Sequence, residues 1–387
     1  MSLTHLFPRF DEEAPRPVID EAALRAEVRG FVRGEIERGT IRPGRQTWTT
    51  FDRDFSRSCA AAGYIAMTWP RAFGGHERSL FERYVVCEEL LAVGAPQGAH
   101  WIADRQSGPQ IMRNGTDAVK RAILPRIAAG ECTIGIGMSE PDSGSDLSSI
   151  RTRADKVDGG YRVYGRKVWT TNAQHADYVI ALCRTAPGTE DRYAGLSQLV
   201  VPMRGDGITV RPLRDLRGED ELNEITFDGA FVPEDHLLGA EGDGWKLVNE
   251  ELAFERSGPD RFLSTFGLLS VMAELAGRDP DRFAAMEIGR LTGRLTAIRQ
   301  LSLLINRRLA AGRTVGALAP IMKDLGTALE QEIPEVARRI LDIRPFDEGE
   351  ATRGALATAI LSAPSFSLRG GTREILKGII AREMGLR

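Results

Sequence analysis

Cysteine is scarce in this chain, and no two cysteines stand close together. The 387-residue sequence holds four of them, Cys59, Cys87, Cys132 and Cys183, and none forms a CxxC pair. Zinc sites and disulfide frameworks need cysteines or histidines at short, regular spacing, and the five histidines show no such spacing either. The sequence therefore predicts neither a disulfide framework nor a metal site, and it fits a reducing, cytoplasmic setting.

A charge excess and a long apolar run are also missing. The formal net charge is −3, which gives no bulk electrostatic attraction to nucleic acid or to an anionic membrane. The first ten residues lack the basic start and apolar run of a signal peptide. The uncharged stretch from Gly354 to Leu368 is too short to span a bilayer and contains Pro364. We expect no nucleic-acid partner and no membrane insertion.

Familiar nucleotide and nucleophile motifs are absent as well. No GxxxxGK[ST] occurs, and the nearest approach to GxGxxG, at Gly135, ends in Glu140 and enters a loop. A dinucleotide-binding unit also needs strands that alternate with helices, which the pattern does not show. Neither GxSxG nor a defensible Ser/His/Asp set is present. These absences argue against a Rossmann enzyme, a P-loop enzyme and a serine hydrolase.

The hydrophobic period changes twice along the chain. Residues 21–130 show helical stripes, residues 150–227 show strand-like alternation with Gly-rich turns, and helical stripes return from about residue 243. This order predicts an α+β fold with an N-terminal helical domain at residues 1–135, a central β domain of barrel or sandwich type at 136–245, and a C-terminal helical bundle at 246–387.

Two polar stretches in the middle of the chain are candidates for ligand binding. MSEPDSGSD, residues 138–146, offers hydroxyls and glycines, although such a sequence also forms an ordinary self-capped surface turn. GRKVWTTN, residues 165–172, places Trp169 beside threonines, where an indole can flank a planar ligand or simply belong to the core. The residues alone leave both alternatives open for each stretch.

Two features of the last third also carry alternatives. Glu255 follows Ala253 and Phe254, so it stands either in an apolar cavity with a perturbed pKa or on the surface, paired with Arg256. SLRGGTREI, residues 367–375, is a phosphate cradle, an ordinary helix start or a place for a catalytic residue.

Taken in order, these stretches resemble the acyl-CoA dehydrogenase family over nearly the whole chain. The resemblance rests on five motifs in the family's order, supported by TWPRAFGG and EELLAVGAP near the N-terminus: MSEPDSGSD, GRKVWTTNA, LRGEDELNEITFDGAFVPEDHLLG, FER and GGTREILKGIIARE. It implies an FAD-dependent enzyme with a C-terminal four-helix bundle, usually assembled as a dimer or tetramer.

Carried over by position, the resemblance also implies a set of site residues. Cofactor contacts fall on Met138, Ser139, Gly144, Ser145, Trp169, Thr171, Thr372 and Glu374, while Ser145 and Arg256 lie toward the substrate. The implied reaction is α,β-dehydrogenation of an acyl-CoA thioester, with electron-transfer flavoprotein as the acceptor. A carboxylate must remove the α-proton in a dry site, because this carbon acid is very weak in water.

The resemblance places that base at Glu255. In the family's common branch the catalytic glutamate directly precedes the Gly-Thr of the last motif, and this chain has Gly370 there. A second branch, which includes isovaleryl- and long-chain-type enzymes, carries its glutamate on the first helix of the C-terminal bundle, directly before an arginine. Glu255 and Arg256 match that pattern.

One region departs from the family. Members often have Arg-x-x-Phe-Gly and a following Gln that hold FAD across a subunit interface, whereas residues 277–284 read GRDPDRFA. Neither Arg278 nor Arg282 is assigned to that role. Some bacterial relatives that act on bulky thioesters such as steroid side chains are heteromers. The alternative function is therefore an FAD-sharing subunit, non-catalytic or half-site, of a heteromeric acyl-CoA dehydrogenase.

Overall fold

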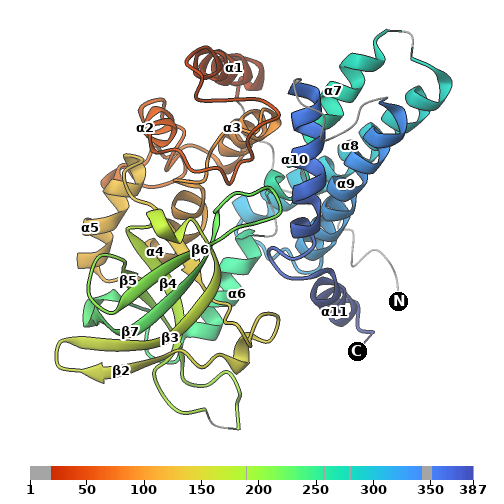
Figure 1. Ribbon diagram of the computed structural model, residues 1–387. Coiled ribbons are helices and arrows are strands. Elements are labelled where there is room, and N and C mark those ends of the chain that lie inside the picture. The colour runs from red at the N-terminus through yellow and green to blue at the C-terminus, as the bar shows by residue number, and fades with distance from the viewer. Residues whose placement is uncertain (1–18, 189, 256–257, 279, 342–350, 387) are drawn as a thin grey trace. The chain divides into compact units, whose positions relative to one another are not determined.

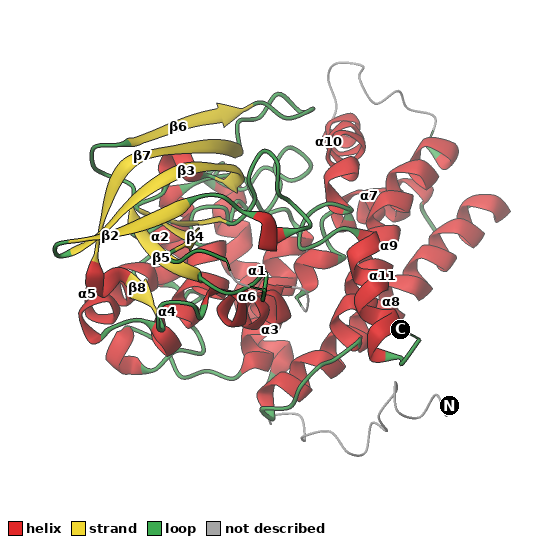
Figure 2. Cartoon of the chain, turned by 90° about the horizontal axis from the view of Figure 1, so that it is seen from below, coloured by secondary structure: helices red, strands yellow, loops and turns green. Residues whose placement is uncertain are grey.

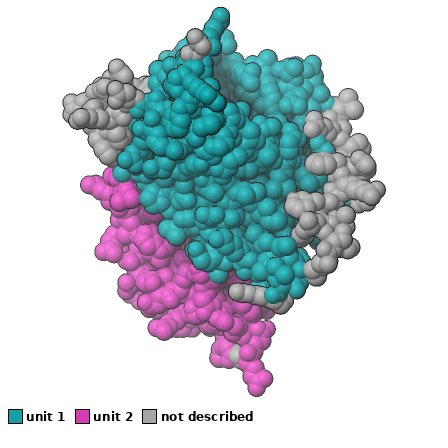
Figure 3. Space-filling model, turned by 90° about the vertical axis from the view of Figure 1, so that its right-hand side faces the viewer, with its two compact units in different colours: residues 1–48, 78–96, 255–387 teal, residues 49–77, 97–254 magenta. Residues whose placement is uncertain are grey.

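The computed structural model describes residues 19–188, 190–255, 258–278, 280–341 and 351–386 (Figure 1). The chain divides into two compact units, which Figure 3 colours separately. Unit 1 comprises residues 1–48, 78–96 and 255–387, and unit 2 comprises residues 49–77 and 97–254. Each unit therefore combines segments that are far apart in the sequence. The domain boundaries expected at residues 135 and 245 stay a prediction.

Unit 2 contains the sheet, whose strands are coloured yellow in Figure 2. The strands are β1 (Ile134–Gly137), β2 (Arg153–Val157), β3 (Gly160–Thr171), β4 (Tyr178–Arg184), β5 (Leu196–Pro202), β6 (Ile208–Leu213), β7 (Leu222–Pro233) and β8 (Leu237–Leu238). Their order in the sheet is β6-β7-β3-β2-β4-β5-β8, and β1 pairs in parallel with β4. Helices of the same unit are α2 (Arg53–Ala61), α4 (Gly108–Asn114), α5 (Asp117–Ala128) and, up to residue 254, α6 (Gly244–Glu255).

The core of unit 2 follows from the alternation of its long strands. β3 and β7 pair antiparallel over most of their length, and Tyr161 lies opposite Val232 in this ladder. Because side chains alternate between the two faces of a strand, one face of each collects the apolar residues. Val163, Phe227 and Ala230 are buried there together with residues of β4 and β5. This buried layer gives the loops at the strand ends a rigid base.

Unit 1 is helical. α9 (Leu318–Ile340) packs against α7 (Phe266–Ala276), α8 (Arg282–Ala310), α10 (Ala351–Phe366) and α11 (Arg373–Glu383). The N-terminal helices α1 (Glu21–Glu37) and α3 (Leu80–Ala92) belong to the same unit, and α3 contacts α8. Ser79 and Glu82 begin α3 with a reciprocal capping box, which satisfies amides that the first turn leaves open. The sequence predicted an α+β fold with a sheet between helical regions, and the structure confirms it.

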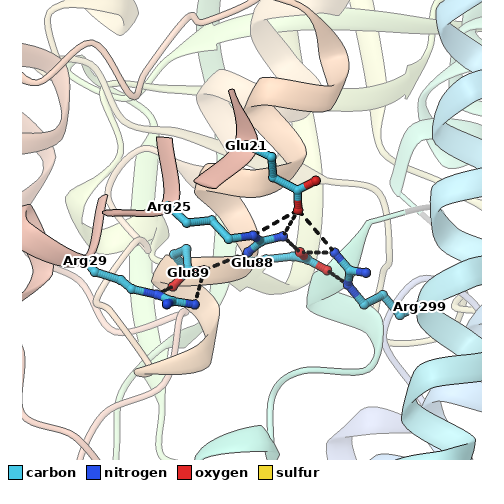
Figure 4. Close-up of polar contacts among 6 residues, drawn as sticks. All are labelled: Glu21, Arg25, Arg29, Glu88, Glu89 and Arg299. Atoms are coloured by element: carbon cyan, nitrogen blue, oxygen red, sulfur yellow. Dashed lines mark hydrogen bonds and ion pairs between the residues drawn. The ribbon is translucent and has the colours of Figure 1, made fainter. Parts of the chain in front are cut away.

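Charged side chains join α1, α3 and α8 within unit 1 (Figure 4). Arg25 lies 2.7 Å from both Glu88 and Glu89, and Arg299 binds Glu88 at 2.6 Å. Arg29 adds a second partner to Glu89 at 2.8 Å. The two carboxylates come from adjacent positions on α3, so this cluster ties α1 to α8 of the C-terminal bundle.

No helix in the described part of the chain is long and apolar enough to cross a membrane.

Candidate functional site

The loop after β1 carries the first group of expected site residues, Met138 to Ser145. Its fold depends on its own hydroxyl groups: Ser143 Oγ donates to the Asp146 carbonyl at 2.6 Å, and Ser148 Oγ donates to the Asp146 carboxylate at 2.5 Å. The loop is therefore a self-bonded turn, as one of the two sequence interpretations expected. That turn leaves Gly144 and Ser145 exposed, and a Cβ on Gly144 would meet nothing within 4 Å.

Trp169 lies on a β-bulge rather than in the core. Between Lys167 and Thr170 the register of β3 against β7 shifts, so that β3 has one residue more than its partner. Trp169 takes φ 66°, in the left-handed region that non-glycine residues seldom adopt, and it is 60% exposed. The core interpretation of this tryptophan is therefore wrong. Backbone strain at a bulge that turns an aromatic ring outward is frequent at functional sites.

These residues of unit 2 fit a planar ligand with polar edges. The Trp169 indole supplies a flat apolar surface, while Ser139 and Thr171 are only partly buried and carry hydroxyls that can bond a polar ligand edge. An isoalloxazine ring needs this combination of a flat wall and hydrogen-bond donors.

A buried ion pair lies beneath this surface, and sequence reasoning missed it. Lys167 is completely buried, and its Nζ donates to Glu140 Oε1 at 2.9 Å and to the Met138 carbonyl at 3.0 Å. Burial lowers the pKa of Lys167, while Cys183 and Glu140 oppose that shift. Burial also acts against ionisation of Glu140, but the charge of Lys167 and bonds from Thr152 and Arg151 hold its pKa below the usual range. The only signal in the sequence was a lysine next to Val168 in a strand-like stretch.

In unit 1, the Gly-Gly-Thr turn begins the last helix. Thr372 is the N-cap of α11, and its Oγ1 accepts from the Ile375 amide at 3.4 Å. Glu374 is exposed in the first turn, where its own backbone amide and the Thr372 hydroxyl lower its pKa. The helix-start interpretation is confirmed. A helix N-terminus also favours negative charge, so a contact between this turn and a phosphate stays compatible with it.

Two cations, the buried Lys323 and the partly exposed Arg369, hold the turn, and sequence reasoning missed these too. The fully buried Lys323 donates to the Gly371 carbonyl at 2.7 Å. Arg369, directly before the two glycines, donates to Glu330 at 2.8 Å and to the Asp260 carbonyl at 3.3 Å. Glu330 and Asp260, the two partners of Arg369, lie 39 and 109 residues away from it in the sequence, so no local pattern indicated them.

Glu255 is the last residue of α6, and its side chain is outside the described part of the structure, as is Arg256 altogether. One turn earlier, Glu251 is 3% exposed and accepts from Gln198 Nε2 at 3.5 Å. Gln110 in turn donates to Gln198 Oε1 at 3.1 Å and to the Leu247 carbonyl at 3.3 Å. This amide network fixes α6 against the sheet of unit 2.

His175 and His236 take supporting roles. His175 stacks on Phe51 with ring centroids 4.1 Å apart, and burial together with Arg53 lowers its pKa. His236 Nδ1 lies 2.7 Å from the Val200 carbonyl. Among the residues with described positions, no three His, Cys, Asp or Glu side chains gather as metal ligands.

Comparisons with known families match most of the chain. The family description "Acyl-CoA dehydrogenase, N-terminal domain" matches residues 19–131, and "Acyl-CoA dehydrogenase, middle domain" matches residues 135–230. The acyl-CoA dehydrogenase FadE26 of Mycobacterium tuberculosis is 32% identical over 374 residues, which is 92% of this chain and 90% of that protein.

Solved structures give the same result. The Tcur3481-Tcur3483 steroid ACAD superposes with a TM-score of 0.83 at 26% identity and covers 95% of this chain and 96% of its own. The ChsE4-ChsE5 complex from Mycobacterium tuberculosis superposes with a TM-score of 0.78 at 27% identity, over 97% of this chain and 98% of its own.

Proposed function

Because the chain belongs to the acyl-CoA dehydrogenase family, we propose that it oxidises an acyl-CoA between its α- and β-carbons with Glu255 as the base. Members of this family are FAD-binding flavoproteins, so the chain is an FAD-dependent oxidoreductase. The position of the base, the substrate and the electron acceptor are the parts that we propose.

One observation carries the choice of base. Glu255 ends α6 directly before Arg256, while Gly370 occupies the position at which the common branch of the family has its glutamate. Gly370 has φ 67° in the turn before α11 and provides no side chain there. Without a carboxylate at residue 370, the reaction needs a catalytic carboxylate at another position. Glu255 occupies the position at which the second branch of the family carries its glutamate.

Each residue then has a defined task. The Glu255 carboxylate takes the α-proton in a water-poor site, and hydrogen bonds to the thioester oxygen stabilise the charge that develops. When bound, FAD supplies the redox chemistry by accepting the hydride from the β-carbon. The residues that would hold the cofactor are those that the resemblance assigns to it: Met138, Ser139, Gly144, Ser145, Trp169, Thr171, Thr372 and Glu374. Ser145 and Arg256 would also contact the substrate.

The decisive experiment measures flavin bleaching by acyl-CoA in Glu255→Gln, with Glu250→Gln as the matched control on the same helix. Loss of a general base lowers the rate by about 10²–10⁴-fold, so Glu255→Gln should retain FAD and bleach at least about a hundred times more slowly. Glu250→Gln should bleach at the wild-type rate. Full bleaching by Glu255→Gln would remove Glu255 from the role of base.

The substrate that we expect is a bulky, steroid-type acyl-CoA. The similar Tcur3481-Tcur3483 protein is named a steroid ACAD, and similarity to it extends over 95% of this chain. A panel of short, long, branched and steroid-type acyl-CoAs, ranked by the rate of flavin bleaching, tests this expectation. Electron-transfer flavoprotein is the proposed acceptor, and its reduction by the bleached enzyme is the corresponding assay.

A second candidate function is that of an FAD-sharing subunit in a heteromer. Two observations favour it: the Tcur3481-Tcur3483 and ChsE4-ChsE5 structures each combine two named chains, and residues 277–284 lack the Arg-x-x-Phe-Gly pattern. Within this stretch Asp281 caps α8 and Phe283 is 44% exposed. Protein that is colourless alone and turns yellow on co-expression with a homologue supports this function, whereas a yellow homo-oligomer with full activity excludes it.

A further inference from the structure

The buried pair of Lys167 and Glu140 connects the two polar stretches of unit 2. Lys167 Nζ donates to the Met138 carbonyl at 3.0 Å and to Glu140 Oε1 at 2.9 Å. The next residue, Val168, donates its amide to the Ser139 carbonyl at 2.9 Å. Two consecutive residues of β3 therefore hold three consecutive residues of the loop.

Glu140 extends the same connection to the far end of the loop. Its carboxylate accepts from the Arg151 amide at 2.7 Å and from the Thr152 amide at 2.9 Å. The loop is thus fixed where it leaves β1 and again where it approaches β2. A Cβ on Gly137 would lie 3.3 Å from Lys167 Cγ, so the lysine stem passes directly across the end of β1.

Stability alone does not explain a charged pair at this depth. Taking two charges out of water costs several kcal/mol per ion, and well-packed apolar residues of similar volume are often as stable or more stable. Lys167 and Glu140 are 0% and 9% exposed, and neighbouring inward residues of β3 such as Val163 are apolar. What the pair adds over an apolar replacement is a fixed direction for the backbone groups that it binds.

Met138 and Ser139, whose carbonyls are fixed in this way, are among the residues assigned above to the flavin. Trp169 follows Val168 directly and takes its left-handed φ at the bulge that begins after Lys167. Lys167 therefore binds the loop of Met138 and Ser139 from a position two residues before the indole, so it couples the position of the loop to that of the bulge. A shift of Lys167 would therefore move the loop and the Trp169 indole together.

We propose that Lys167 and Glu140 are positioning residues, which hold Met138 and Ser139 in register with the Trp169 indole for FAD binding. The proposal rests on the assignment of these three residues to the cofactor under the proposed function. It gives the pair no contact with the substrate and no part in proton transfer.

The test compares the FAD dissociation constant and the visible spectrum of bound flavin in Lys167→Met, Glu140→Gln and a matched control. The control is Asp177→Asn, since Asp177 is also a buried carboxylate that binds a backbone amide, from Thr133 at 3.0 Å, and an arginine, Arg126 at 3.2 Å. Thr133 and Asp177 precede β1 and β4, whereas Glu140 follows the other end of β1.

We expect Lys167→Met to weaken FAD binding at least tenfold and to shift the flavin absorption bands. Glu140→Gln should change both in the same direction by a smaller factor. Asp177→Asn should lower thermal stability while it leaves the flavin affinity within twofold and the spectrum unchanged. Combining Lys167→Met with Glu140→Gln should weaken binding by less than the product of the single effects, because the two residues act as one unit.

Wild-type affinity and spectrum in folded Lys167→Met would overturn the proposal. If that variant does not fold, Glu140→Gln decides, and indistinguishable behaviour of Glu140→Gln and Asp177→Asn would overturn it equally. Flavin binding without bleaching by any acyl-CoA would refute the proposed dehydrogenation alone, because affinity and spectrum do not depend on turnover. Absence of FAD binding in the wild type, alone and with a co-expressed homologue, would overturn both.

Discussion

Arg25 offers the sharpest test of how α1 is held by the other helices of unit 1. Its guanidinium contacts Glu88 and Glu89 at 2.7 Å each and Glu21 at 2.8 Å (Figure 4). The two α3 carboxylates are 8% and 10% exposed, so little water can replace a lost partner. The change to test is Arg25→Met, which keeps much of the apolar stem and removes the charge.

The loss of stability in Arg25→Met depends on which ion-pair partners Glu88 and Glu89 retain. Removing one partner of a buried ion pair costs about 3–5 kcal/mol. Here Arg299 still binds Glu88 at 2.6 Å and Arg29 still binds Glu89 at 2.8 Å, so neither acid is left alone. Arg25 itself is 19% exposed. We therefore expect about half of the full penalty, about 2 kcal/mol less free energy of unfolding.

Arg29→Met is the matched control, because Arg29 binds the same Glu89 but is 64% exposed. Exposed ion pairs contribute only about 0–1 kcal/mol. In urea unfolding followed by circular dichroism, the free energy of unfolding of Arg25→Met should therefore be well below that of Arg29→Met. Added salt should weaken the contribution of Arg29 more than that of Arg25, since screening acts mainly on exposed charges. Equal losses in the two variants would refute the argument that burial at α3 sets the strength of the cluster.

Two further predictions concern acid and the bulge. Burial opposes ionisation of Glu89, but Arg29 and Arg25 bring its pKa in the folded state below its ordinary 4.5. The stability that ionised Glu89 contributes is therefore complete above about pH 4.5 and is lost as pH falls through the folded pKa. The urea midpoint should fall in that pH range, and the difference in unfolding free energy between wild type and Arg25→Met should disappear. Trp169→Gly should change the unfolding free energy of flavin-free protein by less than about 1 kcal/mol, because relief of the left-handed backbone offsets the added freedom of glycine, while FAD affinity measured by flavin fluorescence should fall at least tenfold.

The layout of helices and strands was predictable because its signals are local. A period of 3.6 or 2 residues is set by neighbours along the chain, so the stripes of α8 and the alternation of β3 appear directly in the sequence. The start of α11 was predictable for a similar reason: within three residues, the two glycines form the turn and Thr372 caps the helix.

The interior of the site was not predictable, because its partners meet only in three dimensions. Lys167 and Glu140 are 27 residues apart, and Arg369 and Glu330 are 39 apart. A lysine on a strand is normally assigned to the exposed face, and only the pairing of β3 with the loop after β1 makes a buried lysine acceptable. The bulge at Trp169 likewise depends on the register with β7, which the letters KVWTTN do not contain.

Gly370 shows how backbone geometry limits the choice of base. Its φ of 67° lies in the left-handed region, where a residue with a Cβ loses about 1–2 kcal/mol. The following Gly371 has φ 96°, still farther from what a side chain tolerates, and Lys323 holds its carbonyl at 2.7 Å. A glutamate at residue 370 would have to carry this strain in a turn that a buried cation keeps from relaxing. A glutamate on α6 adds no such strain to the turn, which makes Glu255 compatible with a tightly held Gly-Gly-Thr and leaves Thr372 free to begin α11.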